Sequence, residues 1–220
     1  MVYAGKTKSG AAHIGVSGRL RDRNLVMWDE ETNSLWSQLS GKAFYGKRKG
    51  EALALTPSVF VGLGTWVKIA PRGKVLALSN VRVKPWHYRR QDLAKGEIRM
   101  GGALALGLRA KGDTLGIPLR LLQKKGAVEV EVGGRRALVL WHRGEMAPLA
   151  YELPAGMHLQ PKGDKLVAGT GEAFDPLTGR PLGKAGSRPS RGLARFPYLP
   201  VLLKAWKGWY PKGRILGQKD

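Results

Sequence analysis

Residues 127–142 read AVEVEVGGRRALVLWH, a pattern typical of a β-hairpin. Apolar and acidic side chains alternate strictly across 128–132, and this period of two indicates a strand with one buried face. The Gly133-Gly134 pair that follows favours a two-residue turn, because glycine adopts positive φ without strain. A second apolar run at 135–141 supplies the returning strand.

Short apolar runs that end at turn residues continue along the rest of the chain. The 220 residues include 31 Gly and 13 Pro, so tight turns are frequent. Further strand candidates are 11–17, 24–28, 34–38, 74–79, 103–109 and 165–168. Helix candidates are fewer, and Gly or Pro interrupts each of them: 57–70, 115–125 and 200–210. We therefore expect a mainly β protein with a few short helices.

An internal repeat predicts two related β-rich halves. TWVKIAPRGKVL at 65–76 aligns without gaps to AWKGWYPKGRIL at 205–216. Upstream, Asp29-x-x-Thr32 corresponds to Asp175-x-x-Thr178. Self-similarity of this kind indicates repeated structural units. We expect halves packed as one compact unit: a first repeat at 1–80, a basic aromatic linker at 81–100, and a second repeat with a basic C-terminal loop at 101–220.

One series of motifs resembles a known protein family. The series is GVSGRL (15–20), NLVM (24–27), Asp29, Thr32 and SLWSQ (34–38). It resembles the prokaryotic domain-of-unknown-function family 3179, and residues 101–216 show a weaker likeness. The resemblance implies a fold and brings no assigned reaction. Family members usually carry a Cys-Pro-Leu turn before this series, and residues 4–10 lack Cys and Pro. This difference excludes a thiol-based function and leaves open that the chain is N-terminally short.

The strongest functional signal in the sequence is its charge. There are 38 Lys and Arg against 16 Asp and Glu, which gives a formal net charge of +22. Because so large an excess repels itself in a compact fold, it indicates a polyanionic partner. No zinc-finger or helix-turn-helix pattern is visible, so we expect DNA or RNA to be bound through phosphates without sequence preference.

Clusters of basic residues, some with aromatic neighbours, are the candidate nucleic-acid contacts. They are Arg19, Arg21, Arg23, Lys47, Arg48, Lys49, Trp86, Tyr88, Arg89, Arg90, Arg180, Lys184, Arg188, Arg191 and Arg195. Two aromatic residues are included because bases stack on aromatic rings. The alternative is a solvated surface with salt-bridge partners, which the scarcity of carboxylates disfavours.

The few carboxylates suggest a second hypothesis, a metal-dependent nuclease. The densest acidic point is 29–31, and its repeat mate is Asp175. Carboxylates can hold Mg²⁺ or Mn²⁺, and the candidate metal ligands are Asp29, Glu31 and Asp175. Candidate catalytic residues for proton transfer are His87, His142 and Glu145. The structural alternative is an Asp-x-x-Thr turn in which Asp accepts backbone N–H groups.

Composition restricts the remaining classes of protein. The absence of Cys excludes disulfides and Cys-ligated zinc. No apolar stretch reaches transmembrane length, and residues 1–6 lack a signal-peptide core. We expect a cytoplasmic protein, or an exported one if a signal was removed before Met1. Few Asn with many Arg, Lys and Pro suggest a thermophilic source. Three rival functions stay open: a non-catalytic polyanion-binding module, a cell-envelope protein and a small-molecule enzyme.

Overall fold

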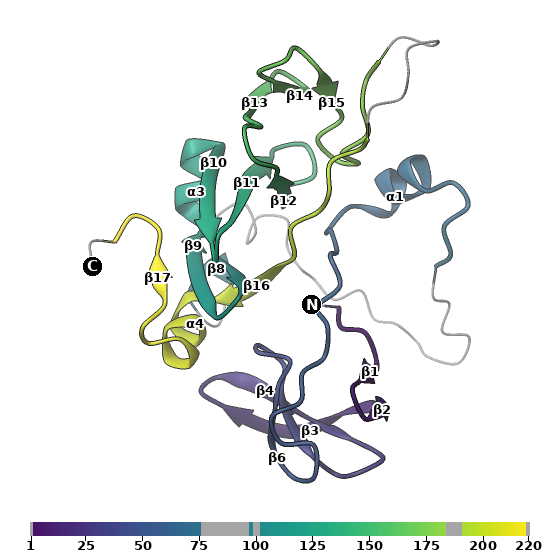
Figure 1. The fold of residues 1–220 in the computed structure, drawn as a ribbon, viewed down its shortest axis with the longest axis vertical. Coiled ribbons are helices and arrows are strands. Elements are labelled where there is room, and N and C mark those ends of the chain that lie inside the picture. Colours follow the sequence, from purple (N-terminus) through teal and green to yellow (C-terminus); the bar gives the residue numbers. More distant parts are fainter. Residues whose placement is uncertain (1, 76–96, 99–101, 184–190, 219–220) are drawn as a thin grey trace. The chain divides into compact units, whose positions relative to one another are not determined.

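The computed structural model describes residues 2–75, 97–98, 102–183 and 191–218 (Figure 1). By their internal contacts the residues form two compact units. Unit 1 comprises Met1–Ser58, Gly102–Leu119 and Pro197–Asp220, and unit 2 comprises Val59–Gly101 and Arg120–Phe196. The mainly β class with a few short helices is confirmed. The expected linker at 81–100 lies outside the described residues except for 97–98, so the division at this linker stays a prediction.

One sheet of unit 1 is an antiparallel meander of four strands. They follow a ribbon of β1 (Lys6–Thr7) and β2 (Gly10–Ala11) and are β3 (Ile14–Arg21), β4 (Asn24–Asp29), β5 (Leu35–Ser37) and β6 (Ala43–Tyr45). The loop between β3 and β4 is Asp22-Arg23, with φ of 47° and 60°. Positive φ at both residues is typical of the type I′ turn, whose twist suits paired strands. The core of this sheet consists of Ala12, Met27, Trp36, Ala43 and Leu53.

The other sheet of unit 1 joins the middle of the sequence to its end. Four of its five strands, in spatial order, are β16 (Tyr198–Leu202), β8 (Gly102–Ala110), β9 (Asp113–Pro118) and β17 (Arg214–Ile215). Helix α4 (Leu203–Trp209) follows β16 and buries Trp206 completely. The indole lies over Gly107 and Gly116, and a Cβ on Gly116 would be 2.8 Å from its Cδ1. Leu39 packs in the same core, which therefore joins the two sheets of unit 1.

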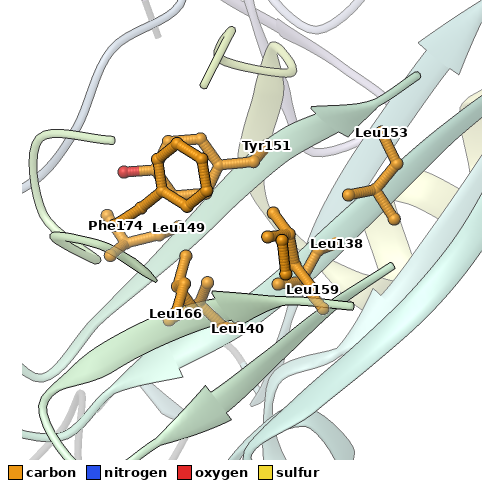
Figure 2. Close-up of a cluster of buried hydrophobic side chains, with 9 residues drawn as sticks. Leu138, Leu140, Leu149, Tyr151, Leu153, Leu159, Leu166 and Phe174 are labelled. Atoms are coloured by element: carbon orange, nitrogen blue, oxygen red, sulfur yellow. The ribbon is translucent and has the colours of Figure 1, made fainter. Parts of the chain in front are cut away.

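Unit 2 contains two three-stranded sheets. In sequence order the elements are α1 (Leu63–Ile69), β7 (Glu97–Ile98), α3 (Leu119–Lys125), β10 (Ala127–Val132), β11 (Arg135–His142), β12 (Ala147–Leu153), β13 (Leu159–Lys162), β14 (Lys165–Ala168) and β15 (Ala173–Phe174). The first residue of α3, Leu119, is assigned to unit 1. Gly133 and Gly134 link β10 to β11 with φ of 56° and 72°, which confirms the predicted hairpin. Figure 2 shows the core to which both sheets contribute, with leucines around Tyr151 and Phe174.

The helices are shorter than the sequence predicts. The candidates 57–70, 115–125 and 200–210 contain α1, α3 and α4, which begin only at Leu63, Leu119 and Leu203. In the last two, the first residues belong instead to β9 and β16. Residues 115–117 of β9 are all buried and pair with β8, so a strand buried on both faces replaces the expected helical turn.

The repeated sequence motifs share their local geometry. Helices α1 and α4 each span seven residues, and each C-cap N–H donates to the carbonyl of the helix tryptophan, Trp66 or Trp206, at 2.9 Å. Three residues later, the N–H of Gly73 or Gly213 donates back to the cap carbonyl at 2.7 or 2.9 Å. The two helices differ in their surroundings, because α4 buries its tryptophan and α1 buries none of its residues.

Candidate nucleic-acid interface

The tip of the β3–β4 hairpin carries three exposed arginines. Arg19 and Arg21 lie on β3, and Arg23 is in the type I′ turn. Gly18, with φ of 71°, lies in the β-bulge of β3. Between its paired residues Val16 and Leu20, β3 has two residues more than the facing stretch of β4, and such an irregularity re-aims the side chains that follow it. β3 is an edge strand of its sheet, and the three arginine side chains are exposed.

Arg21 is held between two aromatic rings. Its guanidinium carbon lies 4.8 Å from the ring centre of Phe44 on β6 and 5.3 Å from that of Trp209 on α4. The Trp209 indole N–H also donates to the Arg21 carbonyl at 3.3 Å. Cation–π contacts of this kind orient a guanidinium without neutralising it. Arg21 keeps about half of its side chain exposed, so its charge remains accessible to a phosphate.

Helix α4 adds two lysines beside the hairpin tip. Lys204 and Lys207 are exposed, while the buried Trp206 between them anchors the helix. A Cβ on Gly208 would lie 3.7 Å from the Cβ of Asp22, so the helix and the turn adjoin. We call the resulting patch the basic surface; its residues are Arg19, Arg21, Arg23, Lys204 and Lys207.

Little negative charge opposes the basic surface. Arg21 Nε lies 3.8 Å from a carboxylate oxygen of Asp22, in an exposed pair. Within the described residues, the other four cations of the surface form no ion pair. Exposed pairs contribute little energy, so the surface stays electropositive.

The 47–49 cluster divides into surface and core. Lys47 and Lys49 are exposed, and their contacts with phosphates stay a prediction, but Arg48 is only 6% exposed. Its Nη1 lies 4.0 Å from a Glu31 carboxylate oxygen, and neither Nε nor Nη1 has a hydrogen-bond partner in the described structure. Arg48 is therefore a buried counter-charge for the neighbouring acidic turn, and the expectation that it presents its charge on the surface is not supported.

Asp29 has both carboxylate oxygens occupied by neutral donors. Oδ1 accepts the N–H and the hydroxyl of Thr32, each at 2.7 Å, and Oδ2 accepts the indole N–H of Trp36 at 2.7 Å. Burial would raise the pKa of Asp29, but these bonds and the charge of Arg48 outweigh it and lower the pKa. The geometry is that of the Asp-x-x-Thr turn, and it leaves Asp29 poorly suited to ligate a metal ion.

Glu31 is engaged by His13. Its Oε1 accepts the backbone N–H of His13 at 3.0 Å and lies 2.5 Å from the ring Nδ1. Desolvation would raise the pKa of Glu31, yet the hydrogen bonds from His13 outweigh it and lower the pKa. Sequence reasoning did not connect His13 with this carboxylate, because the two residues meet only through the pairing of β3 with β4.

Asp175 repeats the Asp29 turn in unit 2. Its Oδ1 accepts the N–H of Thr178 at 2.6 Å and the hydroxyl at 2.7 Å. Asp29 belongs to unit 1 and Asp175 to unit 2, so a shared ion stays a prediction. Over residues 2–75, 97–98, 102–183 and 191–218, no group of three or more His, Asp or Glu side chains is placed to hold a metal ion.

Glu145 and His142 are linked to the start of α1. Glu145 accepts the N–H of Gly62 at 3.0 Å and the hydroxyl of Thr65 at 2.6 Å. The backbone N–H of Glu145 donates to Nδ1 of His142 at 3.0 Å. These bonds favour a structural role, since the carboxylate fixes the first turn of a short helix and the imidazole accepts a backbone hydrogen bond. Catalysis by this pair stays a prediction.

The other predicted contacts lie in unit 2 or outside the described residues. Arg180 and Arg191 are exposed. Arg195 is half-buried; its guanidinium lies 4.6 Å from the Tyr151 ring centre and donates to the carbonyl of Leu177. Arg195 therefore stabilises the packing of unit 2 through these two contacts. The residues outside the described part are Trp86, His87, Tyr88, Arg89, Arg90, Lys184 and Arg188.

Sequence reasoning missed the lysines of α4 and Phe44 as partners of the arginine hairpin. Lys204 and Lys207 are three residues apart on a helix, which places them on one face, so their spacing was a usable signal. The contact between Trp209 and Arg21 joins positions 188 residues apart, and nothing in the local sequence indicates it.

The fold and the site together define a mainly β protein with an exposed basic surface. One arginine of that surface, Arg21, is held by two aromatic rings. The chain belongs to the family described as protein of unknown function (DUF3179), whose model matches residues 1–159. This match confirms the resemblance found in the sequence. No curated protein and no solved structure matches the chain. In the described part of the chain, no helix is long and apolar enough to cross a membrane.

Proposed function

We propose that this protein binds nucleic acid, DNA in the first place, through its phosphates and without sequence preference. The observation that carries the proposal is the basic surface, where the β3–β4 hairpin and α4 gather five cations with one exposed carboxylate beside them. Lysine and arginine that contact phosphates release condensed counterions, which supplies most of the affinity in non-specific binding.

The construction of the surface supports backbone contacts over base reading. Trp206 buries the inner face of α4, and the helix has only seven residues. Its exposed side chains near the hairpin are lysines, which favour phosphates over base edges. Arg21, clamped by two rings, supplies a pre-oriented guanidinium at the centre of the surface. Binding should therefore follow charge and shape.

Hydrolysis of phosphodiester bonds with Mg²⁺ or Mn²⁺ stays a prediction from the sequence. Its leading ligand, Asp29, has both oxygens occupied by Thr32 and Trp36, which suits a turn better than an ion. We therefore propose binding and not turnover. Incubating plasmid with the protein, with either ion and with EDTA, checks for cleavage directly.

A salt titration tests the proposal. The triple variant Arg19→Ala, Arg23→Ala, Lys207→Ala should bind DNA more weakly, and the slope of log affinity against log salt should fall by about 1 for each phosphate contact removed. The measurement is fluorescence anisotropy of labelled DNA between about 50 and 200 mM KCl. Lys124→Ala, Lys125→Ala, Arg143→Ala removes the same charge from exposed positions of unit 2 and serves as the matched control.

Two outcomes would overturn the proposal. One is an equal loss of affinity and slope in both triple variants, which would show that net charge alone attracts DNA. The other is no binding to DNA at low salt while anionic lipid vesicles or heparin are bound, which would favour the cell-envelope alternative.

A further inference from the structure

A row of side chains crosses the first sheet of unit 1. Gly15 on β3 pairs with Trp28 on β4, Trp28 with Leu35 on β5, and Leu35 with Tyr45 on β6. Residues directly opposite in antiparallel strands project from the same face of a sheet. These four residues therefore form one row, which we call the aromatic row.

Because Gly15 has no side chain, the indole of Trp28 lies close against the backbone of β3. A Cβ on Gly15 would lie 2.8 Å from Cε2 of Trp28, so the indole extends across β3 where any larger residue would collide with it. Trp28 and Leu35 are partly exposed, and 65% of Tyr45 is exposed. Tyr45 is therefore the open end of the row, and an exposed aromatic ring of this kind can take part in binding.

The row adjoins positive charge at its β6 end. Lys47, two residues after Tyr45, is exposed, and Lys49 is exposed in the same loop. Phe44, the neighbour of Tyr45 in β6, contacts Arg21 and so links the row to the basic surface. Within the described residues, neither lysine has an ion-pair partner. The occupant of the row should therefore carry both flat apolar faces and regularly spaced negative charge.

We propose that the aromatic row binds single-stranded nucleic acid by base stacking, with Lys47, Lys49 and Arg21 on its phosphates. The inference rests on the proposed function and adds strand type to it. Bases of a duplex stack on each other and hide their faces, whereas a single strand offers them to an aromatic ring. Tyr45 is the ring best placed to receive a base, because Trp28 is partly occupied with covering Gly15.

The experiment compares a thymine oligonucleotide, which forms no duplex with itself, with a duplex of equal length at the same salt concentration. Tyr45→Ala should weaken single-strand binding by about 5- to 150-fold, as for loss of one stacked base, and leave duplex binding unchanged. Tyr45→Phe, which keeps the ring, should bind as the wild type does. Phe60→Ala removes an aromatic ring that is 63% exposed in unit 2, and it is the matched control with no expected effect.

The outcomes separate this inference from the proposed function. If neither DNA is bound, the proposed function fails and the inference fails with it. If both DNAs are bound and Tyr45→Ala changes neither affinity, or weakens both equally, base stacking is refuted while phosphate binding stands. Loss of single-strand binding in Phe60→Ala would also refute the assignment to this row.

Discussion

At residue scale, the carboxylate of Asp29 is the side chain whose environment is best defined. It is completely buried, accepts three hydrogen bonds and lies beside the buried Arg48. Asp29→Asn keeps the shape but removes the charge and turns an amide N–H₂ toward one of the donors. We expect the free energy of unfolding to fall by about 2–4 kcal/mol, measured by urea denaturation.

Asp175→Asn is the matched control for this loss. The Thr178 bonds repeat those of Thr32, but Asp175 is partly exposed, so water can compensate for weakened acceptors. Its loss of stability should be clearly smaller. Equal losses would contradict the view that burial and the Trp36 bond distinguish Asp29.

The lowered pKa of Asp29 also predicts a pH dependence. A carboxyl whose pKa is lower in the folded state stabilises the fold above its unfolded pKa, near 3.9, and loses that contribution as pH falls through the folded value. The difference in unfolding free energy between wild type and Asp29→Asn should therefore be largest at about pH 6 to 7 and shrink below about pH 4. Unfolding curves at a series of pH values check the sign, and a difference that grows on acidification would contradict it.

At the scale of elements, the packing of α4 on β8 and β9 depends on two glycines. The ring of Trp206 occupies the space where side chains of Gly107 and Gly116 would lie. Gly107→Ala should lower the free energy of unfolding by about 1–3 kcal/mol, because overpacking forces the indole and helix away from the sheet. Thermal denaturation measures the loss.

The repeat supplies the control. Gly64 lies in α1, where a Cβ would meet nothing within 4 Å, so Gly64→Ala should be neutral or stabilise by up to about 1 kcal/mol through helix propensity. A destabilised Gly64→Ala protein, or an unchanged Gly107→Ala protein, would show that α1 and α4 do not differ in packing as described.

Elements set by local pattern were predictable, and those set by distant contacts were not. Alternation and the Gly133-Gly134 pair specified the β10–β11 hairpin, and the strand at 165–168 matches β14. The predicted starts of two helices, at 115 and 200, were wrong. These residues form β9 and β16, because hydrogen bonding to β8 stabilises them more than a helical turn would. Arg48 lies in a run of three basic residues, which usually marks a solvated face, yet tertiary contacts bury it.

The candidate site follows the same rule. Charge alone located the arginines of the β3–β4 hairpin, since 19, 21 and 23 alternate in the sequence. Their bracing by Phe44 and Trp209 required two sheets to share a core, which no local spacing encodes. The Asp-x-x-Thr turn, in contrast, is a local motif, and its structural interpretation was available from sequence beside the metal hypothesis.

At the scale of the whole molecule, the excess of positive charge is left largely uncompensated. The ion pairs of the described residues engage arginine and histidine, and no lysine of this part of the chain takes part in one. Lysine is a strongly hydrated point charge that suits phosphate attraction, whereas arginine here also braces rings and carboxylates. The lysines therefore contribute long-range electrostatic attraction, and the arginines contribute positive charges held in defined positions.

This division predicts that salt has opposite effects on folding and on binding. A net charge of +22 destabilises the compact state by self-repulsion, and salt screens that repulsion over a Debye length of about 10 Å at 0.1 M. Raising KCl from about 10 to 100 mM should therefore increase the melting temperature, by about 2–4 °C for each kcal/mol of repulsion removed, while DNA affinity falls. A neutral osmolyte of equal osmolarity, which screens no charge, is the control.

DNA added at low salt should raise the melting temperature as KCl does, because a ligand that binds the folded state stabilises it. If the melting temperature changes with neither KCl nor DNA, the cations are too dispersed to repel one another and too dispersed to bind a phosphate polymer.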